Sequence, residues 1–446
     1  MIDDLVDMER TLIRETLGKV GEEVQLSGWV SVRRDHGKLV FLDVRDRSGS
    51  VQAVVLPQHA EAYAAVQAVR NETVVSIHGK VNERPANAKK EGDVTGGVEI
   101  EVLELTVVAK AAEELPIDLS QTELDLNLDT LLNNRTVALR HRKIQAIFKL
   151  YSLLLEGYDA ACRTEEFVEI KTPKILSAAT EGGANFFKIK YFDREAYLAQ
   201  SPQFYKQAAA SAFERVFEIG SVFRAEPHFT TRHVNEYVGL DGEMAFINGV
   251  EEVMMTLEKI ILATLAHVGS QGKEFLDLYS QVAPPQMAIP RIRLSEALEI
   301  LEKEYGKTVE NEDIDGEGER MICEYVSKTY GSDFVFLTHY PIHLRPFYSM
   351  PSADGKYTET FDLLFRGVEI ASGGQRIHDY QMLVDSIRRK GLEPESFKDY
   401  LDIFRYGAPA HGGWGLGSER IIHKLLGLGS IKEALLYPRD DKRLAP

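Results

Sequence analysis

The chain has 446 residues with 44% hydrophobic and 27% charged side chains, a composition that excludes a disordered or fibrous protein and suggests two or three domains. Asp and Glu outnumber Lys and Arg by 69 to 52, so the net charge is −17 and nucleic acid could bind only at a local basic patch. Two cysteines exclude a disulfide framework and fit a reducing compartment. We find no apolar run near the roughly 18 residues of a membrane span, and expect a cytoplasmic protein without a membrane partner.

The first hundred residues predict a small β-barrel. Short β-prone runs, one helix-prone run and two further β-prone runs follow one another at 23–34, 39–46, 51–56, 58–70, 73–83 and 98–109. Three strands, a helix and two strands is the order of a five-stranded OB barrel, a fold that often holds single-stranded nucleic acid. A generic small barrel fits the same pattern equally well.

The rest of the chain predicts a hinge and an α+β domain. Residues 110–133 carry few periodic signals and include Pro116, so we expect a hinge there, after a barrel domain at 1–109. In 134–446, long amphipathic helices fit 137–164 and 250–269, and short strands fit 167–170, 216–223 and 367–372. Strands scattered between helices without a regular βαβ rhythm favour an antiparallel sheet flanked by helices.

A possible nucleotide site lies at residues 223–237. Arg224 follows a predicted strand, and a planar guanidinium can bridge two phosphate oxygens. Glu226 lies two residues further on, where an extended strand directs it to the same face, and it could accept from an adenine amino group. Tyr237 could stack on the base. Taken alone, these residues fit a surface salt bridge and a core tyrosine better.

A second signal lies near the C-terminus. Gly413, Gly415 and Gly417 alternate before a predicted helix, which lets the backbone lie close to a flat ligand and places Arg420 in the first helical turn. A glycine-rich turn with a solvated arginine is the alternative interpretation.

These segments together resemble the class II aminoacyl-tRNA synthetases. Residues 223–226 are similar to motif 2 of that class, residues 415–420 to motif 3, and the helix ending near 167–173 to motif 1. With the N-terminal barrel as anticodon-binding domain, the order resembles the subclass that charges aspartate, asparagine or lysine. It looks most like aspartyl-tRNA synthetases of the archaeal and eukaryotic type, because the large insertion domain of the usual bacterial type has no room here. The resemblance covers essentially the whole chain.

The resemblance implies an aspartate–tRNA ligase. Such an enzyme activates L-aspartate with ATP to aspartyl-adenylate and transfers it to the 3′ end of tRNA-Asp, with tRNA-Asn as a second acceptor in some relatives. It also implies a homodimer with a twofold interface near Pro173. An asparagine-charging relative, a paralogue with a non-tRNA acceptor and a non-catalytic RNA-binding module are the alternatives.

The resemblance assigns residues to the ATP site. Arg224 and Arg420 would be the catalytic residues that stabilise developing charge, and the ATP-binding set would comprise Arg224, Glu226, His233, Tyr237, Glu369 and Arg420. Glu369 and Ser372 match the family's Mg²⁺ ligands, and Asp362 matches an acidic residue beside them. A solvated acid on a strand edge is the alternative for Asp362.

The amino-acid site implied by the resemblance comprises Glu181, Ser201, Gln203, Lys206, Asp241, Ser372 and Arg376. Arg376 would take the side-chain carboxylate, Asp241 would lie near the α-ammonium, and Glu181 would lie in a mobile loop. An anionic side chain in a dry pocket requires fixed positive charge, and Arg376 with Lys206 supplies two units. Asparagine would match those donors poorly, and asparagine-charging relatives usually lack a lysine at the position of Lys206, so aspartate is favoured.

In the barrel, Phe41 and Gln52 match the family's anticodon contacts, although Phe41 could equally belong to the barrel core. The local basic patch would comprise Arg33, Arg34, Lys38, Arg45 and Arg47. Near the third anticodon base, Ser31 is too small to stack and Pro85 lacks a backbone donor. Such a pocket predicts tolerance of either base, and therefore charging of both tRNA-Asp and tRNA-Asn.

Overall fold

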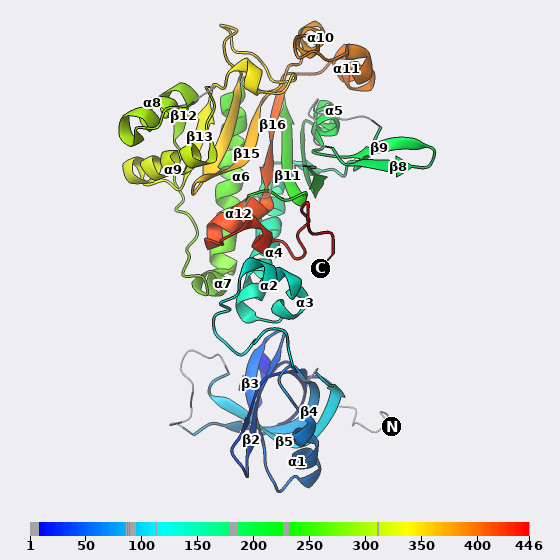
Figure 1. Ribbon diagram of the computed structural model, residues 1–446, viewed down its shortest axis with the longest axis vertical. Helices are drawn as coiled ribbons and strands as arrows, with labels where there is room; N and C mark the ends of the chain where they lie inside the picture. Colours follow the sequence, from blue (N-terminus) through cyan, green and yellow to red (C-terminus); the bar gives the residue numbers. More distant parts are fainter. Residues whose placement is uncertain are drawn as a thin grey trace. The chain divides into compact units, whose positions relative to one another are not determined.

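The computed structural model describes residues 9–85, 87, 89, 95–111, 114–177, 186–225, 232–309 and 312–445. They form two compact units, Met1–Leu126 and Asn127–Pro446 (Figure 1). The division falls inside the segment 110–133 that the sequence predicts as a hinge. Helix α2 (Leu128–Asn133) belongs to the second unit and is capped by the Asn127 side chain, which accepts from the Thr130 amide at 2.8 Å.

The first unit is a closed five-stranded barrel with strand order β1-β2-β3-β5-β4, which confirms the predicted OB architecture (Figure 1). Its strands are β1 (Glu23–Asp35), β2 (Val40–Asp46), β3 (Gly49–Val55), β4 (Val74–Glu83) and β5 (Val98–Ala109). The short helices are η1 (Ile13–Gly18), α1 (Ala60–Ala65) and η2 (Val66–Ala68). Alternate strand residues such as Val40, Leu42 and Val44 are buried in the core, as expected for a barrel filled by side chains.

The second unit is built on an eight-stranded sheet with order β12-β13-β14-β15-β16-β11-β10-β6. In that order the strands are β12 (Arg291–Arg293), β13 (Phe334–Thr338), β14 (Thr360–Phe365), β15 (Val368–Gln375), β16 (His411–Gly417), β11 (Glu236–Ala245), β10 (Arg215–Phe223) and β6 (Val168–Glu169). All neighbours from β13 to β10 are antiparallel, as predicted, whereas the two edge strands β12 and β6 pair in parallel. The sheet is therefore mixed at its edges.

Helices cover this sheet and extend from its ends (Figure 1). They are α3 (Arg135–Ala138), α4 (Arg142–Thr164), α5 (Gln203–Phe213), α6 (Val250–Gln271), α7 (Lys273–Asp277), α8 (Leu294–Tyr305), α9 (Gly316–Tyr330), α10 (Tyr380–Arg389), α11 (Lys398–Arg405) and α12 (Ser418–Leu426). Short 3-10 turns lie at Ile342–Leu344, Pro394–Phe397 and Ile431–Ala434. A three-stranded sheet, β7 (Ile175–Leu176), β9 (Arg194–Leu198) and β8 (Lys188–Tyr191), projects beside α5.

One predicted helix is divided in the structure, and another is more apolar than expected from the sequence. The helix predicted at 137–164 is divided into α3 and α4, because the chain leaves the helix after Ala138 and His141 caps the next one. Helix α6 is long and apolar enough to cross a membrane, so the expectation that no segment has this character was wrong. Half of its apolar window is buried, and it packs against α4, β15 and β16, as a core helix does.

Candidate functional site

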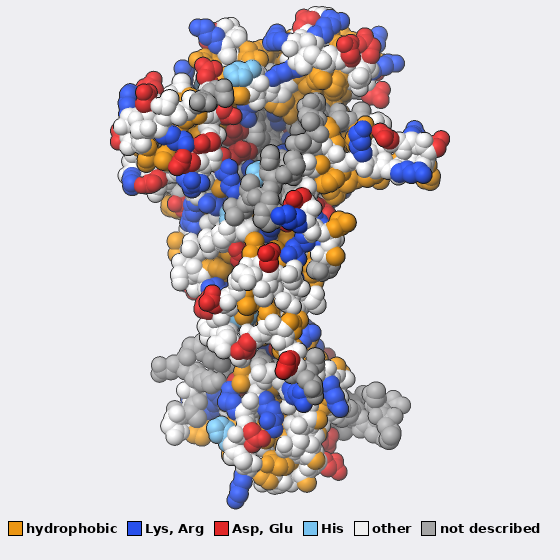
Figure 2. All heavy atoms as spheres, in the orientation of Figure 1, with side chains coloured by type: hydrophobic (Ala, Val, Ile, Leu, Met, Phe, Trp, Pro, Cys, Tyr) orange, Lys and Arg blue, Asp and Glu red, His pale blue; other side chains and the backbone are white. Residues whose placement is uncertain are grey.

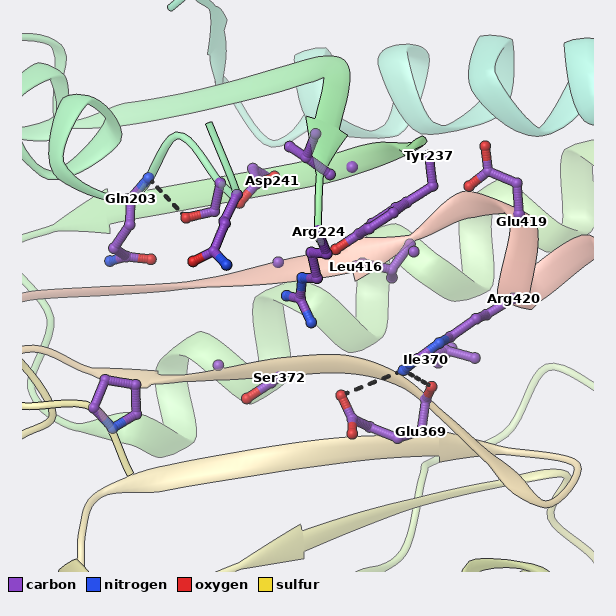
Figure 3. Close-up of a pocket in the computed structure, with 18 of the residues that line it drawn as sticks. Gln203, Arg224, Tyr237, Asp241, Glu369, Ile370, Ser372, Leu416, Glu419 and Arg420 are labelled. Carbon is purple, nitrogen blue, oxygen red and sulfur yellow. Dashed lines mark hydrogen bonds and ion pairs between the residues drawn. The ribbon is translucent and has the colours of Figure 1, made fainter. Parts of the chain in front are cut away.

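A cavity of about 320 Å³ lies over the central strands of the sheet, with walls from α5, β11, β15 and β16 (Figure 3). Eleven of the residues predicted from the sequence line it: Ser201, Gln203, Lys206, Arg224, His233, Tyr237, Asp241, Glu369, Ser372, Arg376 and Arg420. The strand order explains this grouping, because it places β15, β16 and β11 side by side although they are far apart in the sequence. Two further predicted residues, Glu181 and Glu226, lie outside the described residues.

One end of the cavity holds four charged side chains in a single buried network. Lys206 Nζ donates to Asp241 Oδ1 at 2.9 Å and to the Trp414 carbonyl at 2.7 Å, and it lies 3.5 Å from Glu243 Oε2. Arg376 donates to Glu243 through Nε at 3.0 Å and Nη2 at 3.3 Å. None of the four is more than 5% exposed.

This network corrects the charge balance expected from the sequence. Arg376 and Lys206 do not present two uncompensated positive charges, because Glu243 and Asp241 contribute two negative charges beside them. The physical reason is that a buried charge without a partner is strongly disfavoured. The selectivity of this end must therefore come from the positions of donors and acceptors around a neutral cluster.

The two carboxylates of the network differ in their surroundings. Burial opposes ionisation of Glu243, but Arg376 and Lys206 keep the pKa of its carboxyl below the ordinary value. Burial raises the pKa of Asp241, against the attraction of Lys206. Asp241 also lines the cavity, so a second cation that entered there would stabilise its charged form. Glu243 thus acts as the fixed counter-ion of Arg376, and Asp241 is the carboxylate that a ligand can reach.

The glycine run in β16 makes room for these carboxylates. Antiparallel pairing places Gly413 opposite Glu243 and Gly415 opposite Asp241. A Cβ at Gly413 would overlap the Glu243 carboxylate, and one at Gly415 would lie 3.3 Å from Asp241 Oδ1. The sequence pattern indicated close approach of a backbone to a ligand; here the same absence of side chains admits the buried carboxylates of the neighbouring strand.

The other end of the cavity presents cationic and aromatic groups (Figure 3). Arg224 and Tyr237 lie on one side, with the guanidinium 5.7 Å from the ring centroid. Arg420 extends from the first turn of α12 on the opposite side, where Nη1 donates to the Glu369 carbonyl at 2.8 Å and lies 3.6 Å from Glu369 Oε1. Arginine side chains on both sides of a cavity fit a polyphosphate, and the tyrosine ring offers a surface for a base.

Glu369 and Ser372 reach the cavity from the same strand because of a β-bulge. They are three positions apart, so regular alternation would direct them to opposite faces of β15. The pairing of β14 with β15 shifts its register between Leu363 and Leu364, which leaves Ile370 as the extra residue. Glu369, Ile370 and Ser372 all line the cavity as a result.

Asp362 lies beside this pair rather than in the main cavity. It lines an adjoining cavity of about 190 Å³ together with Glu369 and Arg345. Arg345 Nη2 donates to Asp362 Oδ2 at 2.7 Å, and Nη1 donates to Ser372 Oγ at 3.1 Å. Arg345 lines both cavities, and the sequence interpretation missed it because no motif marks it.

The oxygen atoms at this place fit a hard cation. The enclosed position of Glu369 and the negative charge of Asp362 raise the pKa of the Glu369 carboxyl to about 7. Asp362 Oδ1 is buried without a hydrogen-bond partner. In the described ranges, no group of three or more His, Cys, Asp or Glu side chains is arranged to hold a metal alone. Carboxylate and hydroxyl oxygens of this kind suit Mg²⁺, which completes its shell with water and phosphate oxygens.

Glu419 belongs to the segment similar to motif 3, but the sequence assigned it no role in the site. It lies next to Arg420, lines the cavity and is 3% exposed. The Tyr151 hydroxyl donates to Oε1 at 2.9 Å, and the amide of Val238 donates to the same oxygen at 3.0 Å. Ser418 Oγ donates to the Val238 carbonyl at 2.8 Å. These contacts fix the first turn of α12, and so the base of Arg420, against β11.

The predicted anticodon residues lie on the outer face of the barrel unit. Phe41 is half-buried between the core residues Val40 and Leu42, so it points away from the core, and its ring meets His36 edge-on at 5.6 Å. This result removes the alternative of Phe41 as a core residue. Gln52 pairs across from Asp43 on the adjacent strand and donates to Glu99 Oε2 at 3.3 Å.

Ser31 and Pro85 have different surroundings in the same unit. Ser31 Oγ accepts from Arg45 Nη1 at 3.2 Å, and Arg45 also forms a two-pronged ion pair with Glu72 at 2.6 and 2.7 Å. Pro85 is exposed. Figure 2 shows basic side chains mixed with acidic ones on the visible face of this unit. Arg34 and Arg45 of the predicted basic patch are both paired with carboxylates.

Comparison with known proteins places both units in families. Residues 127–441 match the family described as tRNA synthetases class II (D, K and N), and residues 24–113 match the OB-fold nucleic acid binding domain. The chain is 42% identical to an aspartate–tRNA(Asp/Asn) ligase of Deinococcus radiodurans over 98% of this chain and 99% of that protein. It is 44% identical to an aspartate–tRNA(Asp) ligase of Pyrococcus abyssi over 96% of this chain and 97% of that protein.

A solved structure of asparaginyl-tRNA synthetase from Pyrococcus horikoshii, complexed with asparaginyl-adenylate, has the same fold, with a TM-score of 0.89 and 30% identity. It covers 98% of this chain and all of that one. The fold is thus shared with an asparaginyl-tRNA synthetase, whereas the two sequence relatives named above are aspartate–tRNA ligases. The chain belongs to the class II tRNA synthetases and, within them, to the family of aspartate–tRNA ligases.

Proposed function

We propose that this enzyme activates L-aspartate with ATP and transfers the aspartyl group to the 3′ end of tRNA-Asp and tRNA-Asn. The observation that carries the proposal is the buried network of Arg376, Glu243, Lys206 and Asp241 at one end of the cavity. It offers cationic donors for a side-chain carboxylate and a reachable carboxylate for an α-ammonium in one cavity.

The direction of the hydrogen bonds favours aspartate over asparagine. Arg376 and Lys206 carry only N–H donors. Asp241 and Glu243 already accept hydrogen bonds from some of these donors. An aspartate side chain presents two acceptor oxygens to the remaining donors, whereas an asparagine side chain would direct its own NH₂ donors at one of them. A site that presents hydrogen-bond donors rejects a ligand group that also donates, because buried polar groups would be left unpaired.

The nucleotide end supports adenylate formation. We assign the polyphosphate to Arg224, His233 and Arg420 and the adenine to Tyr237 and Glu226, the last of which lies outside the described residues. The aspartate α-carboxylate attacks the α-phosphorus in line, the bond to the bridging oxygen of the β-phosphate breaks and pyrophosphate leaves, while Arg224 and Arg420 stabilise the charge that develops. Glu369 and Ser372, with Asp362 beside them, would hold Mg²⁺, which when bound neutralises phosphate charge.

The barrel unit is proposed to bind the anticodon loop through Phe41 and Gln52. An aromatic ring on the outer face of an OB barrel can stack on an unpaired base, and a glutamine can read a base edge. Ser31 and Pro85 offer no stacking ring and no free backbone donor at the third position. Among the relatives, some are named ligases of tRNA(Asp/Asn) and others of tRNA(Asp), so both specificities exist in the family.

We also propose a homodimer. Strand β6 lies at the end of the strand order, and the parallel pair that it forms with β10 leaves its other side at the sheet edge. Exposed apolar side chains lie on and near it, with Val168 at 45% and Ile175 at 49%. An open edge strand with exposed apolar side chains on it and near it fits pairing with a second copy near Pro173. The two buried, free cysteines suit a cytoplasmic enzyme.

Replacement of Arg376 is expected to remove aspartate recognition. Arg376→Ala should lower aspartate-dependent ATP–pyrophosphate exchange by about a hundredfold or more, because truncating one member of a buried charge pair costs several kcal/mol. Arg376→Lys keeps a positive charge beside Glu243, so it protects the fold but lacks the planar fork. It should raise KM for aspartate by about tenfold or more and leave KM for ATP within about threefold.

Arg388→Ala is the control, since Arg388 lies on α10 in an exposed ion pair with Asp385. Near-normal exchange by both Arg376 variants, with the melting temperature unchanged, would show that the amino-acid site has been assigned to the wrong residues.

The two units should separate in function. Phe41→Ala and Gln52→Ala should reduce the kcat/KM for tRNA charging by about tenfold, because stacking on one base contributes roughly 1–3 kcal/mol. Both variants should leave aspartate-dependent pyrophosphate exchange unchanged. Phe192→Ala, which removes an exposed ring from the second unit, serves as the matched control. Equal losses in both assays would mean that Phe41 supports folding rather than tRNA binding.

The choice of tRNA can be measured directly. Purified transcripts of tRNA-Asp and tRNA-Asn should both be aspartylated, with kcat/KM values that differ by less than about a hundredfold, or roughly 2.7 kcal/mol. Ser31→Trp adds a ring that could stack on a base and is expected to widen that difference. A larger preference of the unmodified enzyme for tRNA-Asp would refute relaxed specificity while leaving the aspartate proposal intact.

A further inference from the structure

A chain of buried hydrogen bonds connects Gln203 to the backbone behind the amino-acid end of the cavity. Gln203 Nε2 donates to Gln207 Oε1 at 3.2 Å, and Gln207 Nε2 lies 2.9 Å from His411 Nε2. His411 Nδ1 lies 2.8 Å from the carbonyl oxygen of Pro409. The Tyr400 hydroxyl donates to Gln207 Oε1 as well, at 3.0 Å. Gln207 is 0% exposed and His411 1%, so bulk water does not compete with these bonds.

The direction of this chain is set at its far end. A carbonyl oxygen can only accept, so His411 Nδ1 must carry the proton that lies between it and Pro409. In the neutral ring Nε2 is then an acceptor, and Gln207 must present its NH₂ group to it. Gln207 Oε1 consequently points the other way and accepts from Tyr400 and from Gln203.

The neutral form of His411 agrees with its surroundings. Burial lowers the pKa of the ring, and Arg376 and His378 oppose its protonation as well, against the attraction of Glu243. Phe404 covers the ring in a stacked contact at 6.0 Å, which adds an apolar neighbour. A protonated ring would donate from Nε2, so Gln207 would have to turn its amide over and present its oxygen to His411. Its NH₂ group would then face Gln203 and Tyr400, and the direction of those hydrogen bonds would be reversed.

We infer that Gln207 is a positioning residue that fixes the amide of Gln203 with its carbonyl oxygen toward the cavity, where it accepts from the α-ammonium of the amino-acid substrate. Gln203 lines the cavity (Figure 3) and is 4% exposed. Its NH₂ group is held by Gln207 Oε1. The oxygen is therefore the atom left for a ligand. The inference rests on the proposed function, because it takes the ligand to be aspartate.

Gln207→Met tests this inference by replacing the amide with an apolar side chain of similar length. With no acceptor for its NH₂ group, Gln203 can turn over and present a donor to the ammonium. In aspartate-dependent pyrophosphate exchange, KM for aspartate should rise about tenfold or more, and KM for ATP should stay within about twofold. Competitive inhibition by succinate, which has both carboxylates but no ammonium, should also stay within about twofold.

Two further variants separate orientation from general packing. Tyr400→Phe removes the hydrogen bond from the Tyr400 hydroxyl to Gln207 Oε1. It keeps Gln207 Oε1 as the acceptor for the Gln203 NH₂ group, so its KM for aspartate should stay within about twofold. In Gln207→Met the Tyr400 hydroxyl loses its acceptor. The double variant Gln207→Met with Tyr400→Phe removes that hydroxyl as well. It should regain melting temperature relative to Gln207→Met and keep the raised KM for aspartate.

The inference is overturned by an unchanged KM for aspartate in Gln207→Met, by an equal rise in Tyr400→Phe, or by a parallel loss of succinate inhibition. An unmodified enzyme that shows no aspartate-dependent exchange would instead contradict the proposed function, and this inference with it.

Discussion

The ion pair between Arg376 and Glu243 is the interaction on which the amino-acid end of the site depends. A guanidinium stays charged even when it is only 5% exposed, so without a partner it would strongly destabilise the fold, and Glu243, which is 0% exposed, supplies that partner through two hydrogen bonds. Lys206 is held in the same way by Asp241, and it also lies near Glu243. The donors are thereby charged, fixed in position and already compensated before any substrate enters.

The backbone around the network follows from this requirement. Two carboxylates on the same face of β11 need space, and the facing strand provides it by placing glycine opposite each of them. Helix α5 contributes a polar buried face, with Gln203, Lys206 and Gln207 within one helical turn of each other. The bulge in β15 then brings Glu369 and Ser372 to the same cavity from the third side. The glycines of β16, the buried face of α5 and the bulge in β15 are each local features. Together they bring the cationic donors and the reachable carboxylate into one cavity.

Much of the fold could be predicted from the sequence, because it depends on local patterns. Alternation in the first hundred residues predicted five strands and a helix in their order along the chain, and the motif resemblance identified eleven residues that share one cavity. The partners of those residues were harder to find. Glu243 lies two positions after Asp241, so strand alternation could have pointed to it, and Gln207 lies four positions after Gln203 on a helix.

Other features had a weaker signal or none. No motif marks Arg345, which contacts Asp362. Glu419 lies in the segment similar to motif 3, but its contact with Tyr151, distant in the sequence, becomes evident only in the fold. The bulge at Ile370 appears only when β14 and β15 are paired. The expected excess of positive charge in the cavity was also wrong. Arg376 and Lys206 lie in segments that resemble family motifs, but the fold is what places Glu243 and Asp241 beside them as counter-ions.

The central claim is that a neutral network of fixed donors and acceptors selects aspartate. The most direct test measures ATP–pyrophosphate exchange by the unmodified enzyme with L-aspartate and L-asparagine, each over a full range of concentrations. We expect kcat/KM for aspartate to exceed that for asparagine by about a thousandfold or more, since a site that presents hydrogen-bond donors rejects a ligand that presents donors as well. Comparable values for the two amino acids, or a preference for asparagine, would contradict it.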